Sequence, residues 1–166
     1  MSLGSNIDPE RNVPAALELL ARQARLVDVS TIYRTRPLDR PEQGMYLNGV
    51  CRIRTNLPPR VLKFDCLRKV EAALGRVRTE DAFEARTIDF DIVLYGDRVI
   101  READLFVPDP EVAIRPFVAL PLFELAPDTQ MPDTGRPLRE IVREMSRDDL
   151  IADIPFTKAL RARLEL

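Results

Sequence analysis

The stretch Ala85-Arg86-Thr87-Ile88-Asp89-Phe90-Asp91-Ile92-Val93-Leu94-Tyr95-Gly96-Asp97 alternates apolar and polar side chains with the period of a β-strand. One face is wholly apolar and consists of Ile88, Phe90, Ile92 and Leu94. The opposite face carries Asp89 and Asp91, whose Cβ atoms should lie roughly 6.5–7 Å apart, from a rise of about 3.3 Å per residue. Asp is a poor strand former, so two of them in the middle of a strand call for a reason.

Two explanations of this carboxylate pair stay open on the stretch alone. Both side chains can reach one cation or two neighbouring cations, which makes a metal site. Alternatively, both can face water or pair with Arg86 and other arginines. The rest of the chain must decide between them.

Length and composition describe an ordinary globular protein. A chain of 166 residues with 45% apolar and 31% charged residues is expected to form one domain with a proper core. No apolar run approaches the roughly 18–20 residues of a membrane span, and no basic-then-apolar leader opens the sequence. Cys51 and Cys66 are too few for a disulfide framework, so we expect two small core residues and a cytoplasmic location.

The charged residues narrow the chemistry. The net charge of −2 argues against a polyanion binder, so no nucleic-acid partner is expected. Histidine is absent, which excludes Ser-His-Asp and Cys-His catalysis and histidine-ligated zinc. Carboxylates, guanidinium groups, hydroxyls and the backbone remain, and this set suits a hard cation such as Mg²⁺.

Periodicity and turn residues predict the order of elements. Asp8 as N-cap and Pro9 as first residue open a helix that runs to about residue 23. Further elements are expected as strands at 26–33 and 46–55, a helix from Pro58-Pro59 to about residue 74, short strands at 98–100 and 105–107, and helices at 114–125 and 137–145. Long loops are expected at 34–45 and 75–85.

The predicted fold class is α+β. With a first strand in residues 1–3, which is short, the order strand, helix, strand, strand, helix, strand makes a ferredoxin-like βαββαβ antiparallel sandwich with extra C-terminal strands and helices. In this plan the first and last core strands are central neighbours, so Gly4-Ser5-Asn6 should meet the two aspartates. Residues 1–145 are expected to form a single domain, and the aperiodic residues 146–166 a tail that can be loosely attached.

The sequence resembles the 6-hydroxymethyl-7,8-dihydropterin pyrophosphokinase family from residue 3 to about residue 127. The strand motif at 86–96 looks like the family signature. The accompanying segments follow in the family's order: Leu3-Gly4-Ser5-Asn6, Tyr33-Arg34-Thr35, Tyr46-Leu47-Asn48, Gly75-Arg76-Val77-Arg78, Val107-Pro108 and Pro121-Leu122. The resemblance implies transfer of the β,γ-diphosphate of ATP to a pterin hydroxymethyl group in folate biosynthesis, which makes the chain a Mg-dependent diphosphotransferase.

The resemblance also implies roles on the nucleotide side. Asp89 and Asp91 correspond to family residues that hold two Mg²⁺ ions bridging the ATP phosphates, with ATP as co-substrate. The implied catalytic residues are Arg76, Arg86, Asp89 and Asp91. The implied ATP-binding residues are Glu71, Arg76, Arg78, Arg86, Ile92 and Arg115. Structural salt bridges, a helix-surface Glu71 and a core Ile92 are the competing explanations.

On the pterin side, Tyr46 and Phe117 look like the two rings that sandwich the heterocycle, an arrangement favourable for offset stacking. Asn48 can offer both a donor and an acceptor to the pterin edge. The remaining substrate-binding residues implied by the resemblance are Thr35, Leu38 and Phe83. Core packing of the rings and plain exposure of Leu38 are the alternatives.

Two positions depart from the family pattern. Phe83-Glu84-Ala85-Arg86 stands where the family commonly has Trp-Gly-Pro-Arg, and Asp109 stands where it has histidine. Both changes add negative charge near a site for an anionic ligand. They motivate a first rival hypothesis, a non-catalytic paralogue that binds nucleotide or pterin. A second is an interaction domain whose acids are merely surface residues.

Overall fold

The computed structural model describes residues 1–37, 40–78, 81 and 84–166. A six-stranded antiparallel sheet has the strand order β5-β1-β4-β3-β8, and β2 also pairs with β4. Its strands are β1 (Ser2–Ser5), β2 (Arg25–Val29), β3 (Tyr33–Thr35), β4 (Tyr46–Arg54), β5 (Asp89–Asp91) and β8 (Ile151–Ala152). A separate hairpin consists of β6 (Ile100–Glu102) and β7 (Leu105–Val107). The predicted α+β class is confirmed.

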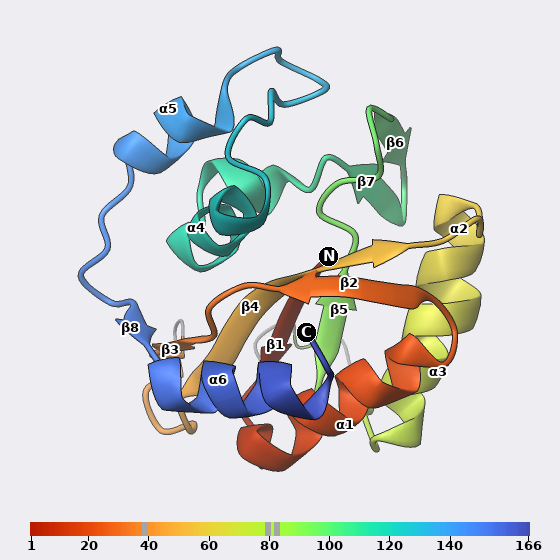
Figure 1. Cartoon of the computed structure of the whole chain (residues 1–166), viewed down its shortest axis with the longest axis vertical. Coiled ribbons are helices and arrows are strands. Elements are labelled where there is room, and N and C mark those ends of the chain that lie inside the picture. The colour runs from red at the N-terminus through yellow and green to blue at the C-terminus, as the bar shows by residue number, and fades with distance from the viewer. Residues whose placement is uncertain (38–39, 79–80, 82–83) are drawn as a thin grey trace.

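Helices cover both faces of the sheet (Figure 1). They are α1 (Pro9–Ala21), α2 (Pro59–Val61), the π-helical segment η1 (Leu62–Leu67), α3 (Arg68–Ala73), the 3₁₀ helix η2 (Pro110–Ala113), α4 (Pro116–Leu125), α5 (Leu138–Arg143) and α6 (Ile154–Arg163). α1 and the α2-η1-α3 segment pack on one face, where the larger core includes Leu17, Leu67 and Phe90. α4 and α5 pack on the other face around Val50 and Val93. In the part of the chain that the structure describes, no helix is long and apolar enough to cross a membrane.

The first helix begins where the sequence predicts, but its cap differs. Asp8 has a left-handed backbone (φ 42°), and its side chain makes no capping hydrogen bond. Asn12 instead donates from Nδ2 to the Ile7 carbonyl at 2.7 Å, and backbone Asn12 N–H donates to the Asp8 carbonyl. The prediction of Asp8 as N-cap and Pro9 as first helical residue is therefore confirmed, although the left-handed Asp8 caps the helix without a side-chain hydrogen bond.

The second helix is less regular than its apolar stripe suggests. Its six central residues form a π-helical segment, η1, between two α-helical pieces. Because a π turn inserts residues into the helix, it changes the direction in which the following side chains point. One side chain of this segment, Lys63, contacts Asp91 of β5.

The two ends of the core pair as expected, although β5 is shorter than the alternating stretch. β1 lies between β4 and β5, with Ser2 opposite Asp91 and Gly4 opposite Asp89. β5 is therefore adjacent to β1 but lies at the end of the described strand order, not at the centre. Burial still follows the predicted alternation, since Ile88, Phe90 and Ile92 are all buried.

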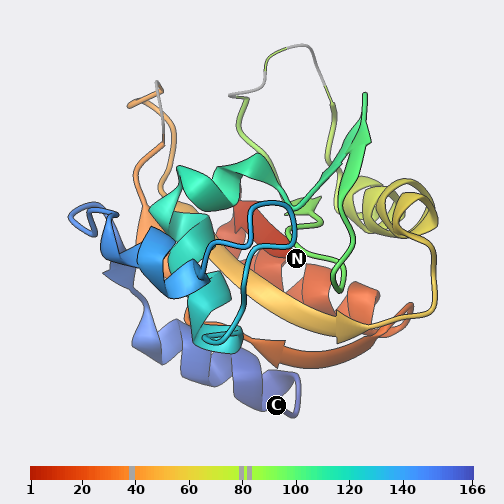
Figure 2. The same ribbon diagram turned by 90° about the horizontal axis from the view of Figure 1, so that it is seen from above.

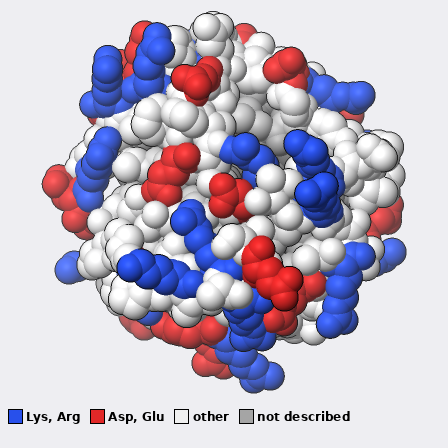
Figure 3. Space-filling model, in the orientation of Figure 1, with Lys and Arg blue, Asp and Glu red and all other residues white. Residues whose placement is uncertain are grey.

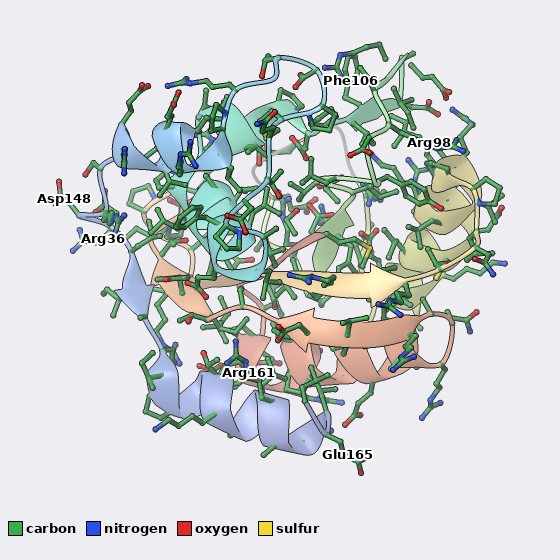
Figure 4. The ribbon with its side chains drawn as sticks, turned by 45° about the horizontal axis from the view of Figure 1, so that its top comes forward. Arg36, Arg98, Phe106, Asp148, Arg161 and Glu165 are labelled. Atoms are coloured by element: carbon green, nitrogen blue, oxygen red, sulfur yellow. The ribbon has the colours of Figure 1, made fainter. Side chains whose placement is uncertain are left out.

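The C-terminal segment, for which the sequence suggested loose attachment, contacts the sheet. β8 pairs with β3, and α6 buries Leu160 and Thr157. Arg161 reaches from α6 toward β2, where its Nε donates to the Val29 carbonyl at 2.8 Å (Figure 4). The position of a domain limit at residue 145 stays a prediction.

Candidate functional site

A cavity opens on the face of the sheet that also carries α4. Its walls come from four strands and from the segment around η2 and α4. The lining residues are Ser2, Leu3, Gly4, Thr35, Pro37, Gln43, Tyr46, Asn48, Arg86, Asp89, Asp91, Glu111, Arg115, Phe117 and Val118. The cavity thus brings together half of the residues predicted for the nucleotide side, namely Arg86, Asp89, Asp91 and Arg115, and most of those predicted for the pterin side.

The strand register explains why these side chains converge. Asp89 lies opposite Gly4 of β1, and Gly4 lies opposite Asn48 of β4. Residues directly opposite each other in antiparallel strands point to the same face, so the carboxylate and the amide share one row. Gly4 leaves the space between them open, because a Cβ there would stand 2.8 Å from Asn48 Oδ1.

Each aspartate already contacts side-chain cations. Arg86 Nη1 lies 2.5 Å from Asp89 Oδ2, and Arg78 Nη2 lies 3.5 Å from Asp89 Oδ1. Lys63 Nζ, from η1, lies 3.4 Å from Asp91 Oδ1. Positive charge is therefore held against both carboxylates, as it would be by a bound cation.

The pKa of Asp91 is raised to about 7. Burial is the largest cause, followed by the negative charge of Asp89, and Lys63 opposes both. The same face holds Glu111, whose pKa is raised by burial and by Asp109. Negative charge is concentrated here, so a cation or a cationic side chain is needed when these groups ionise.

Glu71 ties the helix to the aspartate strand. Its side chain is 2% exposed, its Oε1 accepts the Phe90 N–H at 2.9 Å, and its Oε2 accepts from Arg78 Nη2 at 2.5 Å. Phe90 lies between the two aspartates, so this buried carboxylate fixes the backbone that carries them. Glu71 does not line the cavity, and its predicted ATP contact stays a prediction.

Asn6 connects both long loops to the start of the chain. Its Oδ1 accepts the Arg86 backbone N–H at 2.7 Å, and its Nδ2 donates to Gln43 Oε1 at 3.0 Å. The described parts of the two loops project from the same side of the molecule (Figure 2). Arg40 Nη2 also lies 2.7 Å from Asp81 Oδ2, an exposed pair between the loops.

The other end of the cavity is aromatic and amide-lined. Asn48 is buried and donates from Nδ2 to Thr35 Oγ1 at 2.7 Å, which orients its amide. The Tyr46 ring follows on the same face of β4, with the Arg86 guanidinium 6.0 Å from its centroid. Phe117 enters from the first turn of α4.

Two predicted arginines present unpaired donors. Arg115 lines the cavity, and its Nε is buried without a hydrogen-bond partner among the described residues, 3.9 Å from Glu111 Oε1. Arg76 Nε is likewise buried and lacks a partner within the described part of the chain, while Nη1 donates to the Val77 carbonyl. A buried donor without a hydrogen bond costs free energy, which favours an anionic ligand nearby.

Asp109, the most conspicuous departure from the family pattern, has a structural partner. It is the N-cap of η2, and its Oδ1 accepts the Glu111 N–H at 2.8 Å. Its own N–H donates to the Val93 carbonyl. The carboxylate is therefore held by the turn that leads into Glu111 and Arg115.

Some predicted residues lie elsewhere. Leu38 and Phe83 fall outside the described residues. Ile92 is buried in the core and lines a second cavity, with Val50 and Leu122 among its walls. The predicted ATP contact of Ile92 therefore stays a prediction.

Sequence reasoning also missed residues that the structure places at the site. They are Lys63 beside Asp91, and Ser2, Leu3, Pro37, Gln43, Glu111 and Val118 in the cavity wall. The available signal for Lys63 was weak: it is one of three lysines among 25 basic residues. Gln43 and Pro37 lie in the long loop predicted at 34–45.

Comparison with known proteins decides the family. The model of the 7,8-dihydro-6-hydroxymethylpterin-pyrophosphokinase family matches residues 1–127. The chain belongs to this family.

Relatives of the family extend the match over most of the chain. The 2-amino-4-hydroxy-6-hydroxymethyldihydropteridine pyrophosphokinase of Pseudomonas aeruginosa is 40% identical over 145 residues, 86% of this chain and 88% of the relative. The enzyme of the same name from Haemophilus influenzae is 36% identical over 154 residues, 91% of this chain and 94% of the relative. The folic acid synthesis protein fol1 of Schizosaccharomyces pombe is 38% identical over 148 residues, 87% of this chain but 20% of that protein.

Proposed function

We propose that the protein transfers the β,γ-diphosphate of ATP to the hydroxymethyl group of 6-hydroxymethyl-7,8-dihydropterin and releases AMP, a step of folate biosynthesis. Family membership supports this function. The observation that supports this function at the cavity is the row in which Asp89, Gly4 and Asn48 lie side by side on three neighbouring strands. A carboxylate suited to a metal ion and an amide suited to a heterocycle thus face the same cavity.

The pterin alcohol would occupy the aromatic end. Tyr46 and Phe117 provide flat apolar contact, and the oriented Asn48 amide provides hydrogen bonds to the ring edge. In this position the hydroxymethyl oxygen points toward the aspartates. The oxygen attacks the β-phosphorus of ATP, the bond from that phosphorus to the bridging α-phosphate oxygen breaks, and the hydroxyl proton leaves to solvent.

The arginines serve the nucleotide. Arg86 and Arg115 line the cavity, and guanidinium groups bind phosphate oxygens through paired N–H donors. Negative charge that develops on the departing phosphate is stabilised by donors that are already in place. The reaction therefore depends on positioning and electrostatics more than on a general base.

Mg²⁺ dependence, with two ions held by Asp89 and Asp91, is part of the proposal. Among the described residues, no three His, Cys, Asp or Glu side chains converge on one cation position. Two carboxylates nevertheless fit this ion, because Mg²⁺ in nucleotide sites is typically held by one or two carboxylates plus substrate phosphates and water. When bound, Mg²⁺ supplies positive charge to the phosphates.

The finer description of the fold also remains a proposal. The order β5-β1-β4-β2, with α1 and α3 on one face, supports a ferredoxin-like core with C-terminal additions. Small-molecule substrates without a nucleic-acid or membrane partner agree with the mixed charges of the face in Figure 3. A cytoplasmic location is supported by two buried thiols and no disulfide among the described residues.

The function is tested by AMP formation from ATP and Mg²⁺ with and without the pterin alcohol. We expect AMP only when the alcohol is present, and about 100-fold less for Asp89→Ala, as for loss of a charged group that acts in the transition state. Asp128→Ala, which removes an exposed carboxylate, is the matched control. Pterin-independent AMP release, or none from the wild-type protein, would refute the proposal.

A further inference from the structure

Lys63 is a partly buried cation at the site that none of the assigned roles uses. Its side chain is 19% exposed although it is a lysine, and its Nζ lies 3.4 Å from Asp91 Oδ1. The residue sits in the π-helical segment η1. Lysine is seldom buried without a partner, so its partners indicate its purpose.

The surroundings of Lys63 are acidic on several sides. Its charge acts on Asp91 of β5, on Asp109 before η2 and on Asp104 of the β6-β7 turn, and it favours the ionised form of each by lowering its pKa. Asp109 and Asp91 otherwise have raised pKa values because of burial. Without Lys63, the end of the cavity at Asp91 would carry uncompensated carboxylates.

Each of the two aspartates has a side-chain cation beside it. Arg86 is paired with Asp89, and Lys63 is paired with Asp91. Arg86 also lines the cavity in which the phosphates are proposed to lie. If Mg²⁺ takes over the carboxylates, Lys63 loses its ion pair with Asp91 next to a polyphosphate.

We propose that Lys63 is a further nucleotide-binding residue, whose ammonium neutralises Asp91 in the empty site and binds the polyphosphate of the Mg²⁺-nucleotide complex in the loaded site. The proposal rests on the proposed function, because it assumes that the nucleotide phosphates lie beside Asp89 and Asp91. A flexible four-carbon side chain with three donors can change partner without moving the helix.

Lys63 and Asp91 each keep an oppositely charged partner when the nucleotide complex binds. In the empty site the lysine and the carboxylate satisfy each other. In the loaded site the carboxylate would bind the metal ion and the lysine would bind an anionic phosphate oxygen, so neither charge is left without a partner. The Lys63 side chain is 19% exposed and its ammonium favours an anionic partner, so Lys63 should remain near the site in both states.

The test measures nucleotide binding without turnover. Isothermal titration calorimetry with Mg²⁺ and α,β-methylene-ATP, in which the bond that would break is replaced, compares wild-type protein with Lys63→Met and Lys63→Arg. Lys69→Met, which removes an exposed lysine from the same helical segment, is the matched control. AMP, which lacks the β- and γ-phosphates, is titrated in parallel, and urea denaturation checks that each variant is folded.

We expect Lys63→Met to weaken α,β-methylene-ATP about 10-fold or more, the loss of one charge-assisted hydrogen bond, and to leave AMP within about twofold. Lys63→Arg should restore most of the affinity, and Lys69→Met should behave as wild type. Equal affinities of Lys63→Met and wild-type protein, or equal losses for AMP and the ATP analogue, would overturn the proposal. A wild-type protein that binds the analogue in this lysine-dependent way but forms no AMP would refute the proposed reaction alone.

Discussion

Asp91→Asn should make the protein more stable and unable to hold the nucleotide complex. Burial and Asp89 raise the pKa of Asp91 from 3.8 to about 7, so the folded state disfavours its ionised form. The full difference corresponds to an upper limit of about 4 kcal/mol. Because the side chain is 44% exposed, solvent screening reduces the expected gain to about 1 kcal/mol at pH 8.

The gain should depend on pH in a definite direction. Above pH 7 the folded wild-type protein carries the ionised carboxylate and its whole cost. Between pH 7 and 4 the folded state binds the proton more tightly than the unfolded state, so wild-type stability rises relative to Asp91→Asn as pH falls. Below the unfolded pKa both states are protonated, and the difference disappears.

The assay is urea unfolding of both proteins at pH 8, 6 and 4, with Asp128→Asn as an exposed-carboxylate control. Calorimetry with Mg²⁺ and α,β-methylene-ATP should show at least a 100-fold loss of affinity for Asp91→Asn, since a ligand to the metal is gone. Equal or lower stability of Asp91→Asn at pH 8, or a difference that grows toward pH 4, would refute the reasoning.

Three further substitutions test other parts of the structure. Glu71→Ala removes a buried side chain that accepts the Phe90 N–H, and should lower the free energy of unfolding by about 3 kcal/mol. A loss below about 1 kcal/mol in urea unfolding would contradict the role of Glu71 in holding the aspartate strand. Leu160→Ala should cost about 3 kcal/mol because α6 buries this side chain against the core, and a near-neutral result in the same assay would mean that the tail is loosely attached. Gly4→Ala places a methyl group 2.8 Å from Asn48 Oδ1. In calorimetry it should weaken binding of the pterin alcohol about 10-fold and leave the affinity for AMP nearly unchanged. Unchanged pterin affinity would show that the Asn48 amide does not define that site.

The strand that carries Asp89 and Asp91 could be predicted because a period of two fixes which side chains share a face. Its neighbours also followed from the order of elements, and β1 indeed pairs with β5. The sheet position of β5 could not be read in the same way, since the alternation of one strand says nothing about how many partners it has. The central position expected for it was wrong.

Side-chain contacts that depend on irregular backbone could not be predicted from the sequence. The π-helical turn of η1 cannot be recognised from an apolar stripe, and it contains Lys63, whose Nζ lies 3.4 Å from Asp91 Oδ1. Glu71 looks like a surface residue of an amphipathic helix, but the Phe90 N–H and Arg78 give it buried partners. The role of Asp109 as an N-cap likewise depends on the 3₁₀ helix η2, and no helix was predicted there.

The most direct test of the account follows the phosphorus atoms through the reaction. ATP labelled with ³²P at the β-position is mixed with Mg²⁺, the pterin alcohol and the wild-type protein, and the products are separated. The label is expected in the pterin product while AMP is unlabelled, because the β,γ-diphosphate moves as one unit. Label that remains in ADP, or in unreacted ATP after prolonged incubation, would contradict it.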